Sequence, residues 1–440
     1  MSLEAAIEKM RREGVADVSV DAFARNYERL EAGDRGLIPE AEIEPVDDVP
    51  DAADLPDGGS DALARTVAIK LNGGLGTSMG MTRAKSLIEA KDDLTFLDVT
   101  VRQALALRVP LVFMNSFYTR DDTLAALERY PDATVDDFVQ GKVPKLRADD
   151  LEPVSWPADP DLEWAPPGHG DLYPSLVASG MLARLLDAGY EYAFVSNSDN
   201  LGAAVDARIL GWFEREQLPF AMEVTERLDV DRKGGHVARR QGRLVLREIA
   251  QTPDDDIEAF SNIRRHRFFN TNNLWISLRA LDSVYRERGV IELPMIVNRK
   301  TFDPRDSSSP DVIQLESAMG AAIAAFDGAA AIRVPRSRFI PVKTTDDLLV
   351  LRSDAYVLTD DARVVLAAGR ERPPAVTLAK EHYKLLSEFE AHFPDGPPSL
   401  VEADRLEVEG DVTFGRGVRV RGSVCLDGTE RVPDGAVLEG

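Results

Sequence analysis

Apolar residues near the start of the chain recur at helical spacing in two short runs. The first run is Leu3, Ile7 and Met10, and the second is Val20, Phe23, Tyr27 and Leu30. Residues three or four positions apart lie on one face of a helix, so each run predicts an amphipathic helix. Gly14 stands between the two runs and suits the end of the first helix.

The segment from Ile38 to Asp61 has no such period and is rich in Asp, Pro and Gly. These residues favour turns and irregular backbone, and repulsion between like charges keeps a segment extended. We expect a linker or a surface wrap here. Residues 1–60 therefore form a first unit of two helices and an acidic linker.

From Arg65 onward, short apolar runs alternate with segments of helical period. This alternation predicts an α/β domain with a mixed, largely parallel sheet, which we place at residues 61–355. Ligands of such sheets bind beyond the carboxyl ends of the strands. The expected strands are Val67–Leu71, Leu111–Asn115, Tyr192–Ser196, Phe220–Val224 and Leu274–Ser277.

The last forty residues have a different period. Valine or leucine recurs every six positions at Leu406, Val412, Val418 and Val424, with glycines between them. A six-residue period with glycines is typical of a parallel β-helix, although a few hairpin strands also fit. We place this unit at residues 401–440 and a connecting segment at 356–400.

Composition narrows the class of protein. The 440 residues are 44% hydrophobic and 29% charged, as in ordinary globular proteins. No apolar run reaches the roughly 18 residues that a membrane span needs, and the first residues lack the apolar stretch of a secretory signal. The single cysteine, Cys425, excludes an internal disulfide framework, so we expect a cytoplasmic location.

The net charge of -24 argues against nucleic acid or an anionic membrane as a partner, because like charges repel. A phosphorylated ligand would need a local basic site within this acidic surface. Two basic segments supply a candidate, although a solvated surface stripe also fits them. Their basic residues are Lys70, Arg83 and Lys85, and Arg336, Arg338 and Lys343.

The segment TVAIKLNGGLGTSMGMTRAKSLI begins as a strand, passes through four glycines and continues with helical character. Backbone N–H groups approach phosphate oxygens closely where Cβ atoms are absent, and a following helix N-terminus adds a favourable dipole. Lys85, placed in that helix, would reach a phosphate. A simple strand-to-helix turn is the alternative. The glycines are Gly73, Gly74, Gly76 and Gly80.

A second loop, WAPPGHGDLYPSL, places His169 between Gly168 and Gly170. We expect His169 at the mouth of the sheet as a neutral hydrogen-bonding group, with a purely structural hydrogen bond as the alternative. Asp171 is expected to cap the helix that follows.

Two further loops carry oxygen ligands and amides. The strand in FVSNSDN ends at Asn197 and Asp199, and a carboxylate there suits either Mg²⁺ beside phosphates or a helix cap. In FFNTNNLW, Asn270, Asn272 and Asn273 precede an expected strand. Amides both donate and accept, as sugar hydroxyls require, and asparagine is also common in turns.

In this order, the segments resemble the eukaryotic-type UDP-glucose pyrophosphorylases, which are UTP–glucose-1-phosphate uridylyltransferases. The resemblance covers most of residues 60–440 and implies a Rossmann-like nucleotidyltransferase domain followed by a left-handed parallel β-helix. The motifs that carry it are KLNGGLGTSMG, AKSLI, TFLD, PLVFMNSFYTRDDT, PPGHGD, FVSNSDNLGA, KGG, EIAQ, FNTNNLWISL, VIQLE, VPRSRFIPVKTTDDLL and GDVTFG.

The resemblance also implies roles for individual residues. Lys85, Lys343 and Asp199 correspond to the catalytic groups, and Asp199 to the ligand of a magnesium ion. His169, Asn197 and Asn272 correspond to residues that hold the sugar phosphate. The residues that correspond to UTP contacts are Leu71, Asn72, Gly73, Gly74, Lys85, Gln140, Gly168, Asp199 and Lys343.

The reaction implied is the reversible, Mg²⁺-dependent transfer of a uridylyl group from UTP to glucose 1-phosphate. The partners implied are these two substrates and, through the C-terminal domain, further copies of the chain. A pyrophosphorylase for galactose 1-phosphate or an N-acetylhexosamine 1-phosphate stays open, as does a catalytically silent homologue. A dehydrogenase does not fit, because the glycine loop lacks the GxGxxG pattern.

The sequence departs from the family pattern in two loops. Arg83-Ala84 stands where Gly-Pro is usual before the lysine, and we expect Arg83 to add a phosphate contact. Around Gln140, VQGKVPK replaces the usual NQSxYPR.

Overall fold

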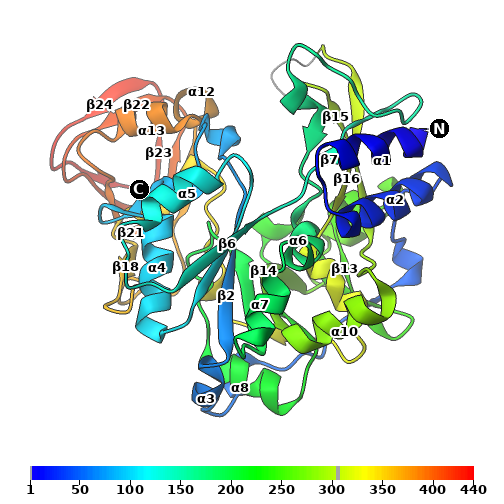
Figure 1. Cartoon of the computed structure of the whole chain (residues 1–440). Helices are drawn as coiled ribbons and strands as arrows, with labels where there is room; N and C mark the ends of the chain where they lie inside the picture. The colour runs from blue at the N-terminus through cyan, green and yellow to red at the C-terminus, as the bar shows by residue number, and fades with distance from the viewer. Residues whose placement is uncertain (1, 304–307) are drawn as a thin grey trace.

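The computed structural model describes residues 2–303 and 308–440, and its centre is a ten-stranded sheet (Figure 1). Seven strands form a continuous path in the order β1-β12-β14-β10-β2-β5-β6, and β11, β13 and β17 pair off this path. The bounds along the path are Glu44–Pro45, His236–Arg240, Phe268–Ser277, Tyr192–Asn197, Thr66–Asn72, Leu111–Asn115 and Val135–Val139.

The sheet is mixed. Strands β10, β2, β5 and β6 run parallel to one another, whereas β14 runs antiparallel to both β10 and β11 (Phe220–Glu226). Strand β17 (Ala330–Arg333) is parallel to β11, and β13 (Arg243–Arg247) is antiparallel to β12. The predicted mixed α/β fold is confirmed, and all five predicted strands are present.

Both faces of the sheet are apolar. Alternate residues of a strand point to opposite faces, and in the central strands the residues of both sets are apolar. In β10, Ala193 and Val195 belong to the main core cluster, and Phe194 belongs to a cluster on the other face. Helices therefore cover both faces, as in other α/β sheets. These helices include α4 (Phe96–Leu107), α6 (Leu172–Ala178), α7 (Met181–Asp187), α8 (Ala207–Arg215) and α10 (Leu278–Arg288).

The two predicted N-terminal helices are confirmed as α1 (Ser2–Arg12) and α2 (Asp17–Glu31). They pack beside β7 (Val143–Pro144), β15 (Met295–Thr301) and β16 (Asp311–Ser317) (Figure 1). The acidic segment after them is a surface wrap: β1 pairs with β12 at one end of the sheet, and Asp51 forms an ion pair with Arg333 at 2.6 Å.

The C-terminal strands lie on the opposite side of the molecule from α1 and α2 and pair in parallel (Figure 1). Leu406 of β21 pairs with Val424 of β23, and each partner is 18 residues further along the chain, as for Asp411 with Thr429 and Arg419 with Val437. The strands are β20 (Ala375–Leu378), β21 (Ser399–Val408), β22 (Asp411–Phe414), β23 (Arg419–Leu426), β24 (Thr429–Val432) and β25 (Val437–Glu439).

The C-terminal unit shares a hydrophobic cluster with the end of the larger domain. The cluster joins Met79 and Phe96 to α11 (Thr345–Arg352), α13 (Leu386–His392) and the C-terminal strands. The unit therefore packs against the segment that follows the glycine loop.

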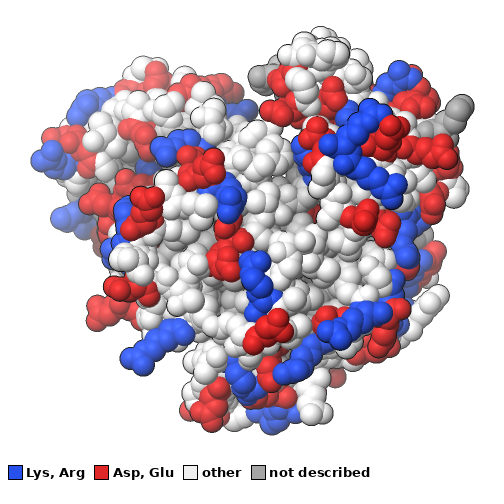
Figure 2. Space-filling view, in the orientation of Figure 1, with Lys and Arg blue, Asp and Glu red and all other residues white. Residues whose placement is uncertain are grey.

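Acidic and basic side chains are interspersed over the face shown in Figure 2 rather than separated into regions of one sign. None of the helices in residues 2–303 and 308–440 has the length and apolar character required to cross a membrane.

Candidate active site

Three parallel strands end together at one edge of the sheet. The register pairs Asn197 at the end of β10 with Leu71, and Asn72 at the end of β2 with Asn115 at the end of β5. The loops after these strands therefore leave the sheet side by side. The edge is the place where α/β sheets bind ligands.

The glycine loop after β2 closes against the loop after β6. A Cβ atom on Gly73 would lie 2.8 Å from Oε1 of Gln140, so the Gln140 side chain packs directly on this glycine. The backbone N–H of Gln140 donates to the backbone carbonyl of Asn115 at 2.8 Å. The structure thus brings Gln140 to the Leu71–Gly74 segment, as the predicted uridine contacts require.

The helix expected after the glycine loop is absent, and that prediction is wrong. Lys85 begins a single 3₁₀ turn, Lys85–Leu87, and the next α-helix begins only at Phe96. Gly76 and Gly80 adopt positive φ angles of 66° and 75° and fold the loop back, so that the Lys85 amide donates to the Gly74 carbonyl at 3.0 Å. Lys85 is held by this loop, and no helix dipole acts there.

Lys85 and Asp199 form an ion pair, with Nζ and Oδ2 2.7 Å apart. The Lys85 ammonium also donates to the carbonyl of Val342, whose amide donates to the Asp199 carbonyl at 3.2 Å. Since Val342 precedes Lys343, three distant segments converge on one point. The predicted catalytic residues Lys85, Asp199 and Lys343 therefore belong to a single site.

Asp199 suits a cation that is shared with a ligand. Lys85 binds Oδ2, and no group of the described residues donates to Oδ1. Residues 2–303 and 308–440 contain no group of three or more His, Cys, Asp or Glu side chains placed to hold a metal ion. Mg²⁺ typically takes one or two protein carboxylates and completes its shell with water and phosphate oxygens. The free carboxylate oxygen of Asp199 fits that requirement.

The side chain of Asn72 lies below the site and not in it. It is buried and donates to Oδ1 of Asn115 at 2.9 Å and to the hydroxyl of Thr123 at 2.8 Å. The Thr119 hydroxyl donates to the Asn72 carbonyl. Asn72 therefore supports the start of the glycine loop from beneath.

The GHGD turn provides a neutral hydrogen-bond donor. Nδ1 of His169 accepts a hydrogen bond from the Met319 amide at 2.9 Å, which leaves the proton on Nε2. Burial lowers the pKa of His169 to about 4, so the ring is neutral at physiological pH, as predicted. Gly168 has a φ of 78°, and a Cβ there would lie 2.5 Å from the Ser317 carbonyl oxygen. Only glycine fits this position.

Asp171 does not cap α6, contrary to the sequence-based prediction. Its side chain makes no cap hydrogen bond. It instead accepts hydrogen bonds from the amide of Gly141 and the hydroxyl of Ser175, both at 2.5 Å. A long-range contact across 30 residues has replaced the local one.

The three asparagines of FFNTNN lie inside β14 and not in a turn before it. Asn270 and Asn272 bind each other through two hydrogen bonds of 2.9 Å, and Asn272 has a φ of 58° opposite a register shift in β11. Asn273 points to the other face, where it is buried and donates to Glu223 at 3.0 Å. Only Asn270 and Asn272 remain candidates for contact with a sugar.

Both arginines of the second basic segment are used in structural ion pairs. Arg338 binds the fully buried carboxylate of Glu223 through two hydrogen bonds of 2.6 and 2.7 Å. Glu223 also accepts from Trp275 at 3.0 Å. Arg336 binds Asp231 in the same bidentate manner, at 2.6 and 2.9 Å. These arginines hold the segment that leads to Lys343.

The other basic residues of the predicted cluster divide between scaffold and site. Lys70 is buried and donates to Ser196 and to the Ala203 carbonyl, and burial together with the charge of Arg338 lowers its pKa to about 7. Arg83 is largely exposed and lies 3.6 Å from Asp122, and its phosphate contact stays a prediction. Lys85 and Lys343 remain as the cations of the site.

The structure adds Glu248, which the sequence reasoning did not single out. A Cβ on Gly235 would lie 2.5 Å from Oε2 of Glu248, and Gly235 accepts from the Asn270 amide at 3.0 Å. Burial raises the pKa of Glu248, and the charge of Lys343 offsets part of that rise. The signal in the sequence is the pair of motifs KGG and EIAQ, which contain Gly235 and Glu248. The structure brings these two residues together.

The comparisons with known proteins agree with this geometry. Residues 20–421 match the family model described as UTP–glucose-1-phosphate uridylyltransferase. The chain belongs to this family. A uridylyltransferase of Solanum tuberosum is 43% identical over 391 residues, which are 86% of this chain and 80% of the relative. A second relative, from Dictyostelium discoideum, is 38% identical over 86% of this chain and 77% of its own.

Solved structures of the uridylyltransferase family share the whole fold. A variant of the Leishmania major UDP-glucose pyrophosphorylase in complex with UDP-glucose has a TM-score of 0.94 and 44% identity, and the match covers 100% of this chain and 98% of that one. The Trypanosoma brucei protein has a TM-score of 0.91 and 45% identity, with 100% and 98% covered. The chain therefore matches these structures in the N-terminal helices and the C-terminal strands as well as in the sheet.

Proposed function

We propose that this protein transfers a uridylyl group from UTP to glucose 1-phosphate and releases pyrophosphate. The observation that carries the proposal is the convergence of Lys85, Asp199 and the Val342–Lys343 segment at the sheet edge. It is supported by family membership and by the likeness to a UDP-glucose complex. The reaction is reversible because the bonds broken and formed are of the same kind.

The chemistry needs no protein nucleophile. The phosphate of glucose 1-phosphate is already ionised at neutral pH and attacks the α-phosphorus of UTP in line, so that the bond to the β-phosphate oxygen breaks. The protein brings two polyanions together and stabilises the charge that develops. Lys85 and Lys343 supply the positive charge. Mg²⁺ held by Asp199 would neutralise phosphate oxygens further when bound.

In this proposal Gln140, Gly73, Gly74 and Gly168 would contact the base and phosphates of UTP, with Leu71 and Asn72 at the start of the same loop. The packing of Gln140 on Gly73 supports these contacts. His169, Asn197 and Asn272 would hold the sugar phosphate. Glu248, which lies over Gly235, would accept hydrogen bonds from sugar hydroxyls.

We also propose that the C-terminal strands form a left-handed parallel β-helix and contribute to self-association. The 18-residue spacing between paired strands equals three six-residue repeats, which is the period expected for one coil. A cytoplasmic location stays a prediction from the single cysteine.

The proposal is tested by incubation with glucose 1-phosphate, Mg²⁺ and each of ATP, CTP, GTP and UTP in turn. Pyrophosphate release with UTP is the expected result, and its absence would overturn the proposal. Replacing glucose 1-phosphate with galactose 1-phosphate or an N-acetylhexosamine 1-phosphate identifies the preferred sugar from kcat/KM.

A further inference from the structure

Asp171 lies where two segments of the base-binding region meet. Its side chain is buried, and Oδ2 accepts from the Gly141 amide and from the Ser175 hydroxyl, both at 2.5 Å. Gly141 follows Gln140, and Asp171 lies two residues after His169. One carboxylate oxygen therefore connects the Gln140 loop to the GHGD turn.

Ser175 completes the connection from the first turns of α6. Its hydroxyl donates to Asp171 and accepts from the Gly141 amide at 3.0 Å, so the three groups form a closed triangle. A Cβ on Gly141 would lie 3.2 Å from Oδ2 of Asp171, so this approach favours glycine. Hydrogen bonds to an ionised acceptor are shorter and stronger than neutral ones.

The backbone is thus held on both sides of the Gln140 Cα atom. Before it, the Gln140 backbone N–H donates to the Asn115 carbonyl of β5, and after it, the Gly141 backbone N–H donates to Asp171. The Gln140 side chain then packs on Gly73 of the glycine loop. If the hydrogen bond between Gly141 and Asp171 were lost, the side-chain amide of Gln140 would lose its fixed orientation.

We propose that Asp171 is a positioning residue for uridine recognition. Its carboxylate orients the side-chain amide of Gln140 and the Gly168–His169 turn around the base. The inference rests on the proposed function, because it assumes that the ligand held there is a uridine nucleotide. Asp171 touches neither substrate and acts through Gly141. The specificity for UTP over CTP then depends on a hydrogen bond behind the binding surface.

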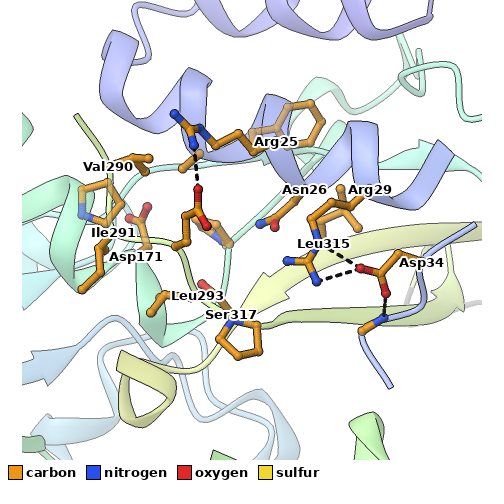
Figure 3. A pocket seen from close by; sticks show the side chains of 18 of the residues that line it. Arg25, Asn26, Arg29, Asp34, Asp171, Val290, Ile291, Leu293, Leu315 and Ser317 are labelled. Atoms are coloured by element: carbon orange, nitrogen blue, oxygen red, sulfur yellow. Dashed lines mark hydrogen bonds and ion pairs between the residues drawn. The ribbon is translucent and has the colours of Figure 1, made fainter. Parts of the chain in front are cut away.

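The fold holds this carboxylate at a cost to stability. Burial raises the pKa of Asp171 to about 6, which means that the surroundings disfavour the ionised form. The side chain lines a cavity of about 880 Å³ between α2 and the GHGD turn, and Ile291 lines the same cavity (Figure 3). Arg25 in this cavity is paired with Glu292 at 2.8 Å, and Arg29 with Asp34. Both arginines bind other carboxylates, and no arginine within residues 2–303 and 308–440 forms an ion pair with Asp171.

Two variants test the inference, with kinetics for UTP, CTP and glucose 1-phosphate and with thermal unfolding. Asp171→Ala removes a charged hydrogen bond, so KM for UTP is expected to rise about ten-fold or more. The ratio of kcat/KM for UTP to that for CTP is expected to fall, while KM for glucose 1-phosphate changes little. Asp171→Asn keeps the shape and removes the charge, so it should weaken discrimination without lowering the unfolding midpoint.

The matched control is Asp98→Ala. Asp98 is also buried, but it caps α4 through Thr95 and lies outside the site. Its loss should lower the unfolding midpoint and leave the UTP-to-CTP ratio unchanged. If both Asp171 variants keep the wild-type ratio, the inference is overturned and the proposed function stands. If the wild-type protein has no activity with UTP, the proposed function fails and the inference fails with it.

Discussion

The Lys85 ammonium lies 2.7 Å from the Asp199 carboxylate, although the two residues are 114 positions apart in the sequence. The pair joins the glycine loop after β2 to the loop after β10. Because Lys85 also donates to the Val342 carbonyl, the pair places Lys343 beside both loops. This arrangement gathers two lysines at one point of a protein whose net charge is -24.

Replacing Lys85 with alanine tests the role of the pair in catalysis. We expect kcat to fall about 100-fold or more, because a charge that stabilises the transition state is lost. The thermal midpoint should change little, since Lys85 lies in a short loop and Asp199 stays partly exposed. Lys380→Ala, at the exposed start of α12 (Lys380–Tyr383), is the control and should keep wild-type kcat. Near-normal turnover of Lys85→Ala would remove Lys85 from the catalytic groups.

Asp199→Asn tests the proposed magnesium ligand. A neutral amide binds a hard cation much less tightly than a carboxylate, so the Mg²⁺ concentration for half-maximal activity should rise about ten-fold or more. Activity is measured against Mg²⁺ concentration at saturating UTP. Asp206→Asn is the matched control, because Asp206 caps α8 through the amides of Arg208 and Ile209. If the two variants show the same Mg²⁺ dependence, Asp199 does not bind the metal.

The Arg338–Glu223 pair is expected to contribute strongly to stability. Arg338→Met leaves the fully buried Glu223 carboxylate without its cation, and breaking such a pair costs about 3–5 kcal/mol. Urea denaturation measures this loss. The exposed pair of Arg421 with Glu439 provides the comparison, and Arg421→Ala should cost far less stability, because water screens exposed charges. A similar small loss for Arg338→Met would show that the network is not buried in solution.

His169 should make the fold less stable in acid. Its folded pKa of about 4 lies below the value of about 6.5 for an unfolded chain. Between these two pH values the unfolded chain binds a proton at His169 that the folded protein does not bind. The contribution of His169 to the free energy of unfolding is therefore fully present above pH 6.5 and is lost as the pH falls toward 4. The thermal midpoint of the wild-type protein should fall more between pH 7 and pH 5 than that of His169→Gln. Equal falls would show that the ring is accessible to protons in the fold.

The strands and the residues at their ends were predictable because both leave local patterns. A run such as Tyr192–Ser196 is apolar on both faces, and polar residues appear directly where it ends. Local rules gave these elements, whereas the roles expected of Lys85, Asp199 and Lys343 came from the long motifs that resemble the family.

The partners of individual charges were not predictable, because tertiary contacts determine them. Arg338 looks like part of a phosphate site until β11 places Glu223 beneath it, 115 positions away. Asp171 stands where a helix cap belongs, and Gly141 takes its carboxylate instead. The glycines after β2 suggested a helix start, whereas the positive φ angles of Gly76 and Gly80 turn the loop back on itself.

The central claim is that this site transfers a uridylyl group to a sugar phosphate. The most direct measurement is pyrophosphate release from each of the four nucleoside triphosphates with glucose 1-phosphate and Mg²⁺, together with identification of the nucleotide product. Release with UTP, formation of UDP-glucose and loss of both in Lys85→Ala are the predicted results. Release with another triphosphate alone, or with none, would contradict the account.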